Sequence, residues 1–221
     1  MVSSFVKYVV SRTYKPLLVK YLSGTRRYAS KGLTLEIPPQ VFHPGFFTST
    51  KLLLRNICKL ELRNRTVLEL GAGSGFIAMQ TAKQGAVVTA TDINPVAIEY
   101  LKKNSKRNGV AVRIIHSDLF DNIPLEAFDI IAINPPYYKK DPQTPGEYAW
   151  YCGRKGEYFE RLFEGLGNYI HESSVVLMVL CDGCDMDLII NMALQKGFRM
   201  QCMAESRNLV EKSFVFHIEK I

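Results

Sequence analysis

The chain has 221 residues, a formal net charge of +7, and hydrophobic and charged contents of 47% and 22%, which suit one globular domain or one domain with a short arm. No apolar run is long enough to span a bilayer, and the N-terminus lacks the order of segments that defines a signal peptide. The five cysteines are an odd number and lie mostly in apolar segments, which indicates reduced thiols in a cytoplasmic protein.

Positive charge is concentrated in the first part of the chain. Residues 1–65 hold 12 Lys/Arg and 2 Asp/Glu, whereas residues 66–221 hold 16 and 19. A basic segment on a nearly neutral body predicts an anionic partner, which we expect to be nucleic acid, a ribosome or an acidic protein face. A solvated basic segment without a partner is the alternative.

Residues 1–50 are expected to form a basic arm of helical and extended segments that ends in an aromatic loop. Apolar residues at rough helical spacing predict a helix over Ser3–Leu22, broken at Pro16 and packed on the rest of the protein. The same stretch has no acidic residue, so it also resembles a mitochondrial presequence. Alternation predicts a short strand over Thr34–Ile37. The aromatic loop, Val41–Phe47, either closes over a ligand or packs as ordinary core.

Residues 51–221 are expected to form the main domain. Thr48–Thr50 offer an N-cap for a helix over Lys51–Leu60. From Thr66 onward strands and helices alternate, which predicts a Rossmann-like, doubly wound α/β sheet of seven mostly parallel strands. The last two strands have no helix between them, so we expect a C-terminal hairpin with one antiparallel strand. The predicted strands are Val67–Leu70, Val87–Thr91, Val112–His116, Asp129–Ile133, Val175–Leu180, Met200–Ser206 and Ser213–Glu219.

A glycine-rich loop follows the first strand of this domain. Glu69 and Leu70 are followed by Gly71-Ala72-Gly73-Ser74-Gly75. Glycines let the backbone approach a ligand closely. A dinucleotide fingerprint would place another glycine where this chain has Phe76. The Glu69 carboxylate would repel a pyrophosphate and suits hydrogen bonds to the ammonium group of a cofactor that carries an amino acid.

Two more carboxylates follow the next two strands. Asp92 lies about 20 residues after the loop, at the position where a carboxylate binds ribose hydroxyls. Asp118 follows the third strand, within reach of an adenine amino group. Each carboxylate alone is also explained as a helix N-cap. Together with Glu69 they occupy three successive strand ends, which predicts a nucleoside site that also includes Ile93 and Leu119.

The fourth strand runs directly into Asn134-Pro135-Pro136-Tyr137. Neither proline has an N–H to donate to a neighbouring strand, so the chain leaves the sheet at Asn134 in a stiff turn. In an open α/β sheet, ligands bind just past the carboxyl ends of the strands. We therefore expect the chemistry of this protein to take place at this turn.

The whole arrangement resembles the class I S-adenosylmethionine-dependent methyltransferases over roughly residues 51–221. The resemblance implies S-adenosyl-L-methionine as the cofactor, held by residues of the glycine loop and the strand ends: Glu69, Gly71, Ala72, Gly73, Gly75, Asp92, Ile93, Asp118, Leu119 and Asn134. The Asn-Pro-Pro-Tyr turn is similar to that of enzymes that methylate planar, poorly nucleophilic nitrogens. Ala149–Gly156 and the tail Glu205–Phe214 resemble the HemK-like protein-(glutamine-N5) methyltransferases, whereas residues 1–40 do not resemble the release-factor-binding domain of the bacterial members.

The turn suits a nitrogen whose lone pair is delocalised. The Asn134 side-chain oxygen and the Pro135 carbonyl can accept its two N–H bonds and so direct its lone pair at a methyl group. These contacts strengthen as the nitrogen becomes positive, which stabilises the transition state. Pro136 stiffens the turn, and Tyr137 can stack on the planar group. The four residues Asn134, Pro135, Pro136 and Tyr137 are the predicted catalytic set.

The leading hypothesis is methylation of a protein glutamine side chain, with a translation factor or ribosomal protein as the substrate. The alternative is methylation of adenine or guanine in RNA or DNA, which the basic arm favours. A binding module without activity is a second alternative, and Phe76 and Glu69 disfavour a nicotinamide-dependent dehydrogenase. Some similar enzymes use a small partner subunit, so we include one among the candidate partners. Cys181-x-x-Cys184 is a single pair, and no metal site is predicted.

Overall fold

The computed structural model describes Tyr21, residues 23–208 and residues 211–221. The helix predicted over Ser3–Leu22 therefore lies, apart from Tyr21, outside the described residues. The division into an arm of residues 1–50 and a domain of residues 51–221 stays a prediction. In the described part of the chain, no helix is both long and apolar enough to cross a membrane.

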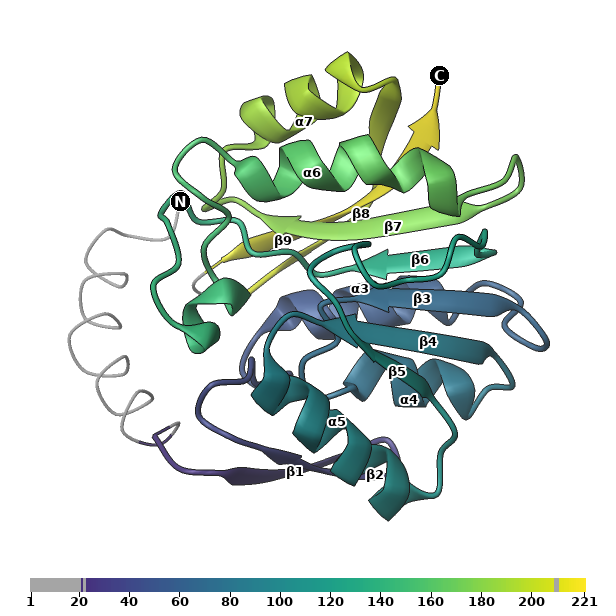
Figure 1. Ribbon diagram of the computed structural model, residues 1–221, viewed down its shortest axis with the longest axis vertical. Coiled ribbons are helices and arrows are strands. Elements are labelled where there is room, and N and C mark those ends of the chain that lie inside the picture. Colours follow the sequence, from purple (N-terminus) through teal and green to yellow (C-terminus); the bar gives the residue numbers. More distant parts are fainter. Residues whose placement is uncertain (1–20, 22, 209–210) are drawn as a thin grey trace.

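Strands and helices alternate through most of the described chain (Figure 1). The strands are β1 (Arg26–Ser30), β2 (Leu33–Ile37), β3 (Thr66–Leu70), β4 (Val87–Asp92), β5 (Arg113–His116), β6 (Ile130–Ile133), β7 (Val175–Cys181), β8 (Phe198–Arg207) and β9 (Lys212–Lys220). The α-helices are α3 (Thr48–Ile57), α4 (Phe76–Ala82), α5 (Pro95–Asn108), α6 (Glu157–Leu166) and α7 (Met186–Gln195), and two short 3₁₀ helices are η2 (Pro145–Ala149) and η3 (Gly167–Tyr169).

The main sheet has seven strands in the order β5-β4-β3-β6-β7-β9-β8. β9 runs antiparallel to both of its neighbours, and the remaining pairs are parallel. The predicted doubly wound sheet with a C-terminal hairpin is thus confirmed. In the register of the sheet, Leu70 at the end of β3 lies opposite Thr91 of β4 and Ile133 of β6. The glycine loop, the Asp92 strand end and the Asn134 turn therefore leave the sheet side by side.

Two hydrophobic cores cover the two faces of the sheet. Alternate residues of a strand point to opposite faces, so Val67 packs in one core and its neighbour Leu68 in the other. Helices α3, α4 and α5 cover the face of Val67, and α6 and α7 cover the face of Leu68. Phe159 and Phe163 of α6 are among the largest fully buried side chains. Burial on both faces explains why the central strands read as continuous apolar runs.

A hairpin formed by β1 and β2 packs on the same side as α5. Its two-residue turn, Lys31-Gly32, has φ angles of 49° and 71°, as a type I′ turn requires. Two asparagines of α5 form hydrogen bonds with the backbone of β2. The Asn104 side-chain oxygen accepts from the Glu36 N–H at 2.8 Å, and the Asn108 side-chain oxygen accepts from the Thr34 N–H at 2.9 Å. The predicted strand over residues 34–37 is confirmed as β2, whereas β1 was not predicted.

Helix boundaries differ from the predictions mainly at α3. The residues expected to cap it, Thr48–Thr50, form its first turn, and the N-cap is Phe47, which makes no side-chain capping bond. Hydroxyl side chains suit a cap in isolation, but here Ser49 and Thr50 are buried inside the protein. The cap of α5 follows the local rules, because Asn94 accepts from the Val96 N–H and Gly109 ends the helix in a left-handed conformation.

Asp129 ties the start of β6 to the start of β3. One of its carboxylate oxygens accepts from the Thr66 N–H at 2.8 Å, and the other pairs with Arg65 at 3.0 Å. The bond from the Thr66 backbone holds the pKa of Asp129 below its usual value. Asp129 therefore contributes stability above the unfolded pKa of about 3.9, and this is lost as the pH falls through the lower folded pKa.

We expect Asp129→Asn to lower the free energy of unfolding by about 1–2 kcal/mol at neutral pH, because a charge-assisted hydrogen bond and an ion pair are weakened. Urea unfolding of variant and wild type should show this difference shrinking below about pH 4. Glu172→Gln is the control, because Glu172 is exposed and makes no ion pair in the described part of the chain. An equal loss in the control, or a difference that does not change with pH, would contradict the assignment.

Candidate active site

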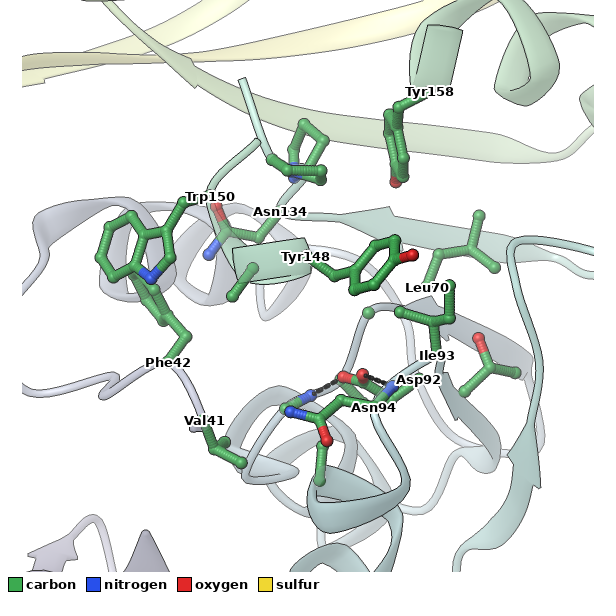
Figure 2. A pocket seen from close by; sticks show the side chains of 18 of the residues that line it. Val41, Phe42, Leu70, Asp92, Ile93, Asn94, Asn134, Tyr148, Trp150 and Tyr158 are labelled. Atoms are coloured by element: carbon green, nitrogen blue, oxygen red, sulfur yellow. Dashed lines mark hydrogen bonds between the residues drawn. The ribbon is translucent and has the colours of Figure 1, made fainter. Parts of the chain in front are cut away.

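A cavity of about 400 Å³ opens at the carboxyl ends of β3, β4 and β6. This volume lies in the range of small-molecule sites, about 300–1,000 Å³. Figure 2 shows two groups of side chains around it. One group surrounds Asn134 with Phe42 and Trp150, and the other surrounds Asp92 with Ile93 and Tyr148. Every residue of the predicted site lines the cavity except Gly75.

The glycine loop is shaped by two different requirements. Gly73 lines the cavity with a φ of 53°, in the left-handed region that favours glycine. Gly75 has a φ of 82°, and a Cβ there would lie 2.0 Å from Leu101 of α5. Gly75 thus lets α4 and α5 approach each other and does not face the ligand space. The predicted place of Gly75 in the cofactor-binding set stays a prediction.

Two buried carboxylates hold this loop in place. Asp92 accepts hydrogen bonds from the N–H groups of Gly73 and Asn94, both at 2.8 Å, which Figure 2 draws as dashed lines. Glu69 accepts from the Ala78 N–H at 2.7 Å, at the start of α4. Burial raises the pKa of Asp92 and raises that of Glu69 to about 8. Buried carboxylates with raised pKa values are matched by a ligand that brings cationic or hydrogen-bond-donating groups.

Asp118 lies at the third strand end, with its carboxylate engaged by α6. Arg161 donates to Asp118 at 2.6 Å and forms a second ion pair with Asp121 at 3.2 Å. The residue after Asp118, Leu119, has a φ of 47°, which is uncommon for a side chain of its type. Ser117 stabilises this turn because its hydroxyl donates to the Leu119 carbonyl and accepts from the Asn122 N–H.

Two tyrosines from the segment after the Asn134 turn line the cavity on the side of Leu70 and Ile93. Figure 2 shows Tyr158 extending from α6 and Tyr148 from η2, on the side of Leu70 and Ile93. Burial, with the charge of Asp118 nearby, raises the pKa of Tyr158. The sequence did not single out either tyrosine or Arg161. Only their closeness to the motif turn could have drawn attention to them.

Asn134 is oriented by α3. Its side-chain amide donates to the Thr50 hydroxyl at 3.5 Å. Its carbonyl oxygen has no hydrogen bond from another described residue, and the side chain lines the cavity. Thr50 was expected only as a helix cap, so its position beside Asn134 is a result of tertiary packing.

The tyrosine of the turn is mostly buried. Tyr137 is 8% exposed and packs edge-to-face with Tyr138 at a ring-centroid distance of 4.9 Å. Burial, with the neighbouring Cys181 as a smaller cause, raises the pKa of Tyr137. The ring lies at the cavity wall, and stacking of an acceptor on it stays a prediction.

An aromatic cluster stands beside Asn134. Phe42 stacks on Phe47 at 4.5 Å between ring centroids, and Trp150 contacts each of them at 5.3 Å. The cluster joins the loop before α3 to the segment after the Asn134 turn, and Phe42 and Trp150 line the cavity. In the aromatic loop, Val41 and Phe42 line the cavity, whereas His43 and Phe46 pack on one another. Closure of this loop over a ligand stays a prediction.

Among the described residues, no three His, Cys, Asp or Glu side chains come together in a way that could hold a metal ion. Cys184 donates to the Cys181 carbonyl at 2.9 Å at the end of β7, where the two cysteines were expected as a single pair.

Comparison with known proteins shows what the whole chain is similar to. Residues 33–150, just over half of the chain, match the model of the family described as "Methyltransferase small domain". A Methanocaldococcus jannaschii protein assigned as a protein N5-glutamine methyltransferase is 32% identical over 193 residues, which cover 85% of this chain and 95% of that protein. The release factor glutamine methyltransferase of Geobacter sulfurreducens is 31% identical, over 58% of this chain but only 45% of its own length.

Solved structures agree on the fold. The Mtq2–Trm112 complex of E. cuniculi, described as responsible for methylation of the eRF1 termination factor, has a TM-score of 0.64 at 20% identity, covering 82% of this chain and 99% of that one. A T. thermophilus 16S rRNA methyltransferase in complex with AdoMet and guanosine has a TM-score of 0.62 at 22% identity, covering 90% of this chain and 51% of that one.

The raised pKa of Glu69 predicts a stability that falls with pH. Between the unfolded pKa of about 4.3 and the folded value of about 8, the folded protein holds a proton that the unfolded chain releases. Glu69→Gln cannot ionise. The free energy of unfolding of this variant, relative to that of the wild type, should therefore rise by up to about 1.4 kcal/mol per pH unit within this range. Urea unfolding without ligand measures this. A constant gap between the two proteins would show that Glu69 is ionised in the folded state.

Proposed function

The chain belongs to the methyltransferase small domain family, and from this membership we propose that it methylates the side-chain amide of a protein glutamine. It is an S-adenosylmethionine-dependent methyltransferase of HemK-like type. The glutamine acceptor is supported by the naming of its relatives, of which the M. jannaschii protein matches over nearly its whole length. The observation that carries the proposal is the position of Asn134, whose amide nitrogen donates to Thr50 and whose side chain lines the cavity.

The cavity fits the cofactor chemically. S-adenosylmethionine supplies an electrophilic methyl group when bound, together with an ammonium group, ribose hydroxyls and an adenine amino group as donors. The three strand-end carboxylates supply acceptors in the same order along the sheet, and we assign Glu69 to the ammonium, Asp92 to the ribose and Asp118 to the adenine. Apolar walls at the adenine end come from Ile93 and Leu119, and the backbone of Gly71, Ala72 and Gly73 borders the space between.

At the acceptor end, the chain itself orients the nitrogen. Thr50 holds the Asn134 amide nitrogen, so the Asn134 oxygen is the group that accepts one N–H of the acceptor. The Pro135 carbonyl accepts the other, and the ring of Pro136 keeps the turn from moving. Both acceptors gain strength as positive charge develops on the nitrogen. Phe42 and Trp150 exclude water from this end of the cavity.

A base in RNA is the second candidate acceptor. The aromatic cluster next to Asn134 favours it, since planar bases stack on aromatic side chains. Tritium transfer from labelled S-adenosylmethionine to cell extract, followed by mass spectrometry, distinguishes the two. N5-methylglutamine in protein supports the proposal, and label found only in N6-methyladenine or methylguanine overturns it. A binding module without activity is set aside because the family consists of methyltransferases.

We propose a cytoplasmic location, which is consistent with translation factors or ribosomal proteins as the acceptors. A small partner subunit is also proposed, because the structurally similar E. cuniculi enzyme was solved with a second chain. Activity of the purified chain alone, compared with activity in cell extract, tests the need for such a subunit.

We expect Asn134→Ala to lower kcat by about 10²–10³-fold, because a hydrogen bond that strengthens in the transition state is lost. The Kd for S-adenosylmethionine should change far less, since the Asn134 oxygen faces the acceptor. Stopped-flow methylation and calorimetry measure the two quantities. Asn122→Ala is the matched control, because Asn122 is exposed and outside the cavity lining. A wild-type kcat in Asn134→Ala would show that the Asn134 turn does not take part in catalysis.

Arg161 is proposed as a positioning residue that acts through Asp118. Arg161→Gln should weaken the binding of S-adenosylhomocysteine about tenfold, a loss of about 1.4 kcal/mol, because the Asp118 carboxylate loses its fixed orientation. It should also reduce the preference for this ligand over its inosine analogue, which lacks the amino group. Arg113→Gln, which breaks an exposed ion pair with Glu126, is the control. An unchanged preference would show that Asp118 does not read the amino group.

A further inference from the structure

A basic surface lies on the β1–β2 hairpin and the helices it packs against. Figure 1 shows the hairpin lying alongside α5, and hydrogen bonds from Asn104 and Asn108 join that helix to β2. We call it the hairpin–α5 surface and define it by the cations of these elements and of the end of α4: Arg26, Arg27, Lys31, Lys83, Lys102, Lys103, Lys106 and Arg107.

The elements that carry these cations are in direct contact with one another. Lys83, at the end of α4, donates to the Gly32 carbonyl at the tip of the hairpin, at 3.1 Å. At the other side of the hairpin, Arg107 of α5 pairs with Glu36 of β2 at 2.8 Å. The three elements are thus locked together by contacts between their own charged side chains and backbone.

The surface holds far more positive charge than its own acids neutralise. The same elements contain two acidic residues, Glu36 and Glu99, against eight Lys/Arg. Glu36 is shared by Arg27 and Arg107, and Glu99 pairs with Lys103. Among the described residues, Lys102 and Lys106 have no acidic partner; they are exposed and one turn apart on α5.

The remainder of the described chain is slightly acidic. The described residues contain 24 Lys/Arg and 21 Asp/Glu. Outside the hairpin–α5 surface, 16 Lys/Arg and 19 Asp/Glu remain. The whole positive excess of the described chain therefore lies on the hairpin and α5. The chain also enters β1 from residues 1–20, whose sequence adds four cations and no acid.

The composition of the surface indicates what it binds. A protein interface needs an apolar core, and a membrane-bound helix needs an apolar face. Among the described residues, the large apolar side chains that are exposed, such as Leu125, Tyr148 and Met203, lie outside β1, β2 and α5. A phosphodiester backbone requires only an array of cations. The surface is therefore better suited to a nucleic acid than to a protein or a membrane.

The surface also borders the active site. β2 ends at Ile37, and Gln40 and Val41, which follow it, line the cavity. The residue that caps α5, Asn94, donates from its side chain to the Gln40 carbonyl at 2.9 Å. The end of the hairpin nearest the cavity carries Arg26 and Arg27, which lie opposite Ile37 and Glu36. A strand bound along the hairpin and α5 would reach the edge of the cavity at this end.

We propose that the hairpin–α5 surface binds the phosphodiester backbone of RNA and so brings the enzyme to its acceptor. The choice of RNA rests on the proposed function, because a protein of the translation apparatus is presented beside RNA. The backbone contacts themselves carry no sequence preference.

Fluorescence anisotropy of a labelled single-stranded RNA with the full chain tests this. If about four cations contact phosphates, affinity should fall about 50-fold between about 50 and 200 mM salt. Changing Arg27, Lys31, Lys102 and Lys106 together to Gln should weaken RNA binding at least about tenfold at low salt and flatten its salt dependence. The matched control changes four other exposed cations to Gln, namely Arg55, Lys59, Lys196 and Lys220, and should keep most of the affinity.

Calorimetry with S-adenosylmethionine shows that both variants are folded, and RNA binding is measured without any methyl transfer. Absence of glutamine methylation would therefore refute the proposed function and leave the RNA result standing. Equal RNA binding by the surface variant and the wild type would overturn the inference, as would equal loss in the control. Tighter binding of duplex DNA or of a polyglutamate peptide than of RNA would also overturn it.

Discussion

The position of β3 between β4 and β6 is the constraint on which the active site depends. Leu70 lies opposite both Thr91 and Ile133, so three strands end at the same level. A shift of one residue would turn the side chains of a strand to the other face of the sheet and mismatch both cores. The two hydrophobic cores therefore fix the register. The register sets Asp92 on one side of the glycine loop and the Asn134 turn on the other.

Without a ligand, the charged carboxylates at these strand ends lower the stability of the folded protein. Burial disfavours the charged forms of Glu69 and Asp92, and each is held by backbone N–H groups of the loop or of α4. The same hydrogen bonds that shape the loop therefore keep two carboxylates inside a closed space. A cationic cofactor relieves this cost, so the site is organised for its ligand at the expense of stability.

The segment after the Asn134 turn serves both ends of the cavity. Its Trp150 packs on the aromatic loop at the acceptor end, whereas Tyr158 and Arg161 of α6 cover the nucleoside end. In the proposed assignment, cofactor and acceptor therefore share this segment as one wall of the cavity. On the opposite side, the hairpin leads from a basic surface into the same cavity through Gln40 and Val41.

Local rules in the sequence determined the doubly wound sheet, the C-terminal hairpin and the strand ends that carry Glu69, Asp92 and Asn134. The patterns of apolar residues, glycine and proline involve only a few neighbouring residues. They can therefore be recognised in the sequence without knowledge of the fold. Tertiary structure alone decided that Gly75 packs on Leu101, that Thr50 orients Asn134, and that Arg161 holds Asp118. These contacts join residues 26 to 84 positions apart, and separations of that size leave no periodic signal in the sequence.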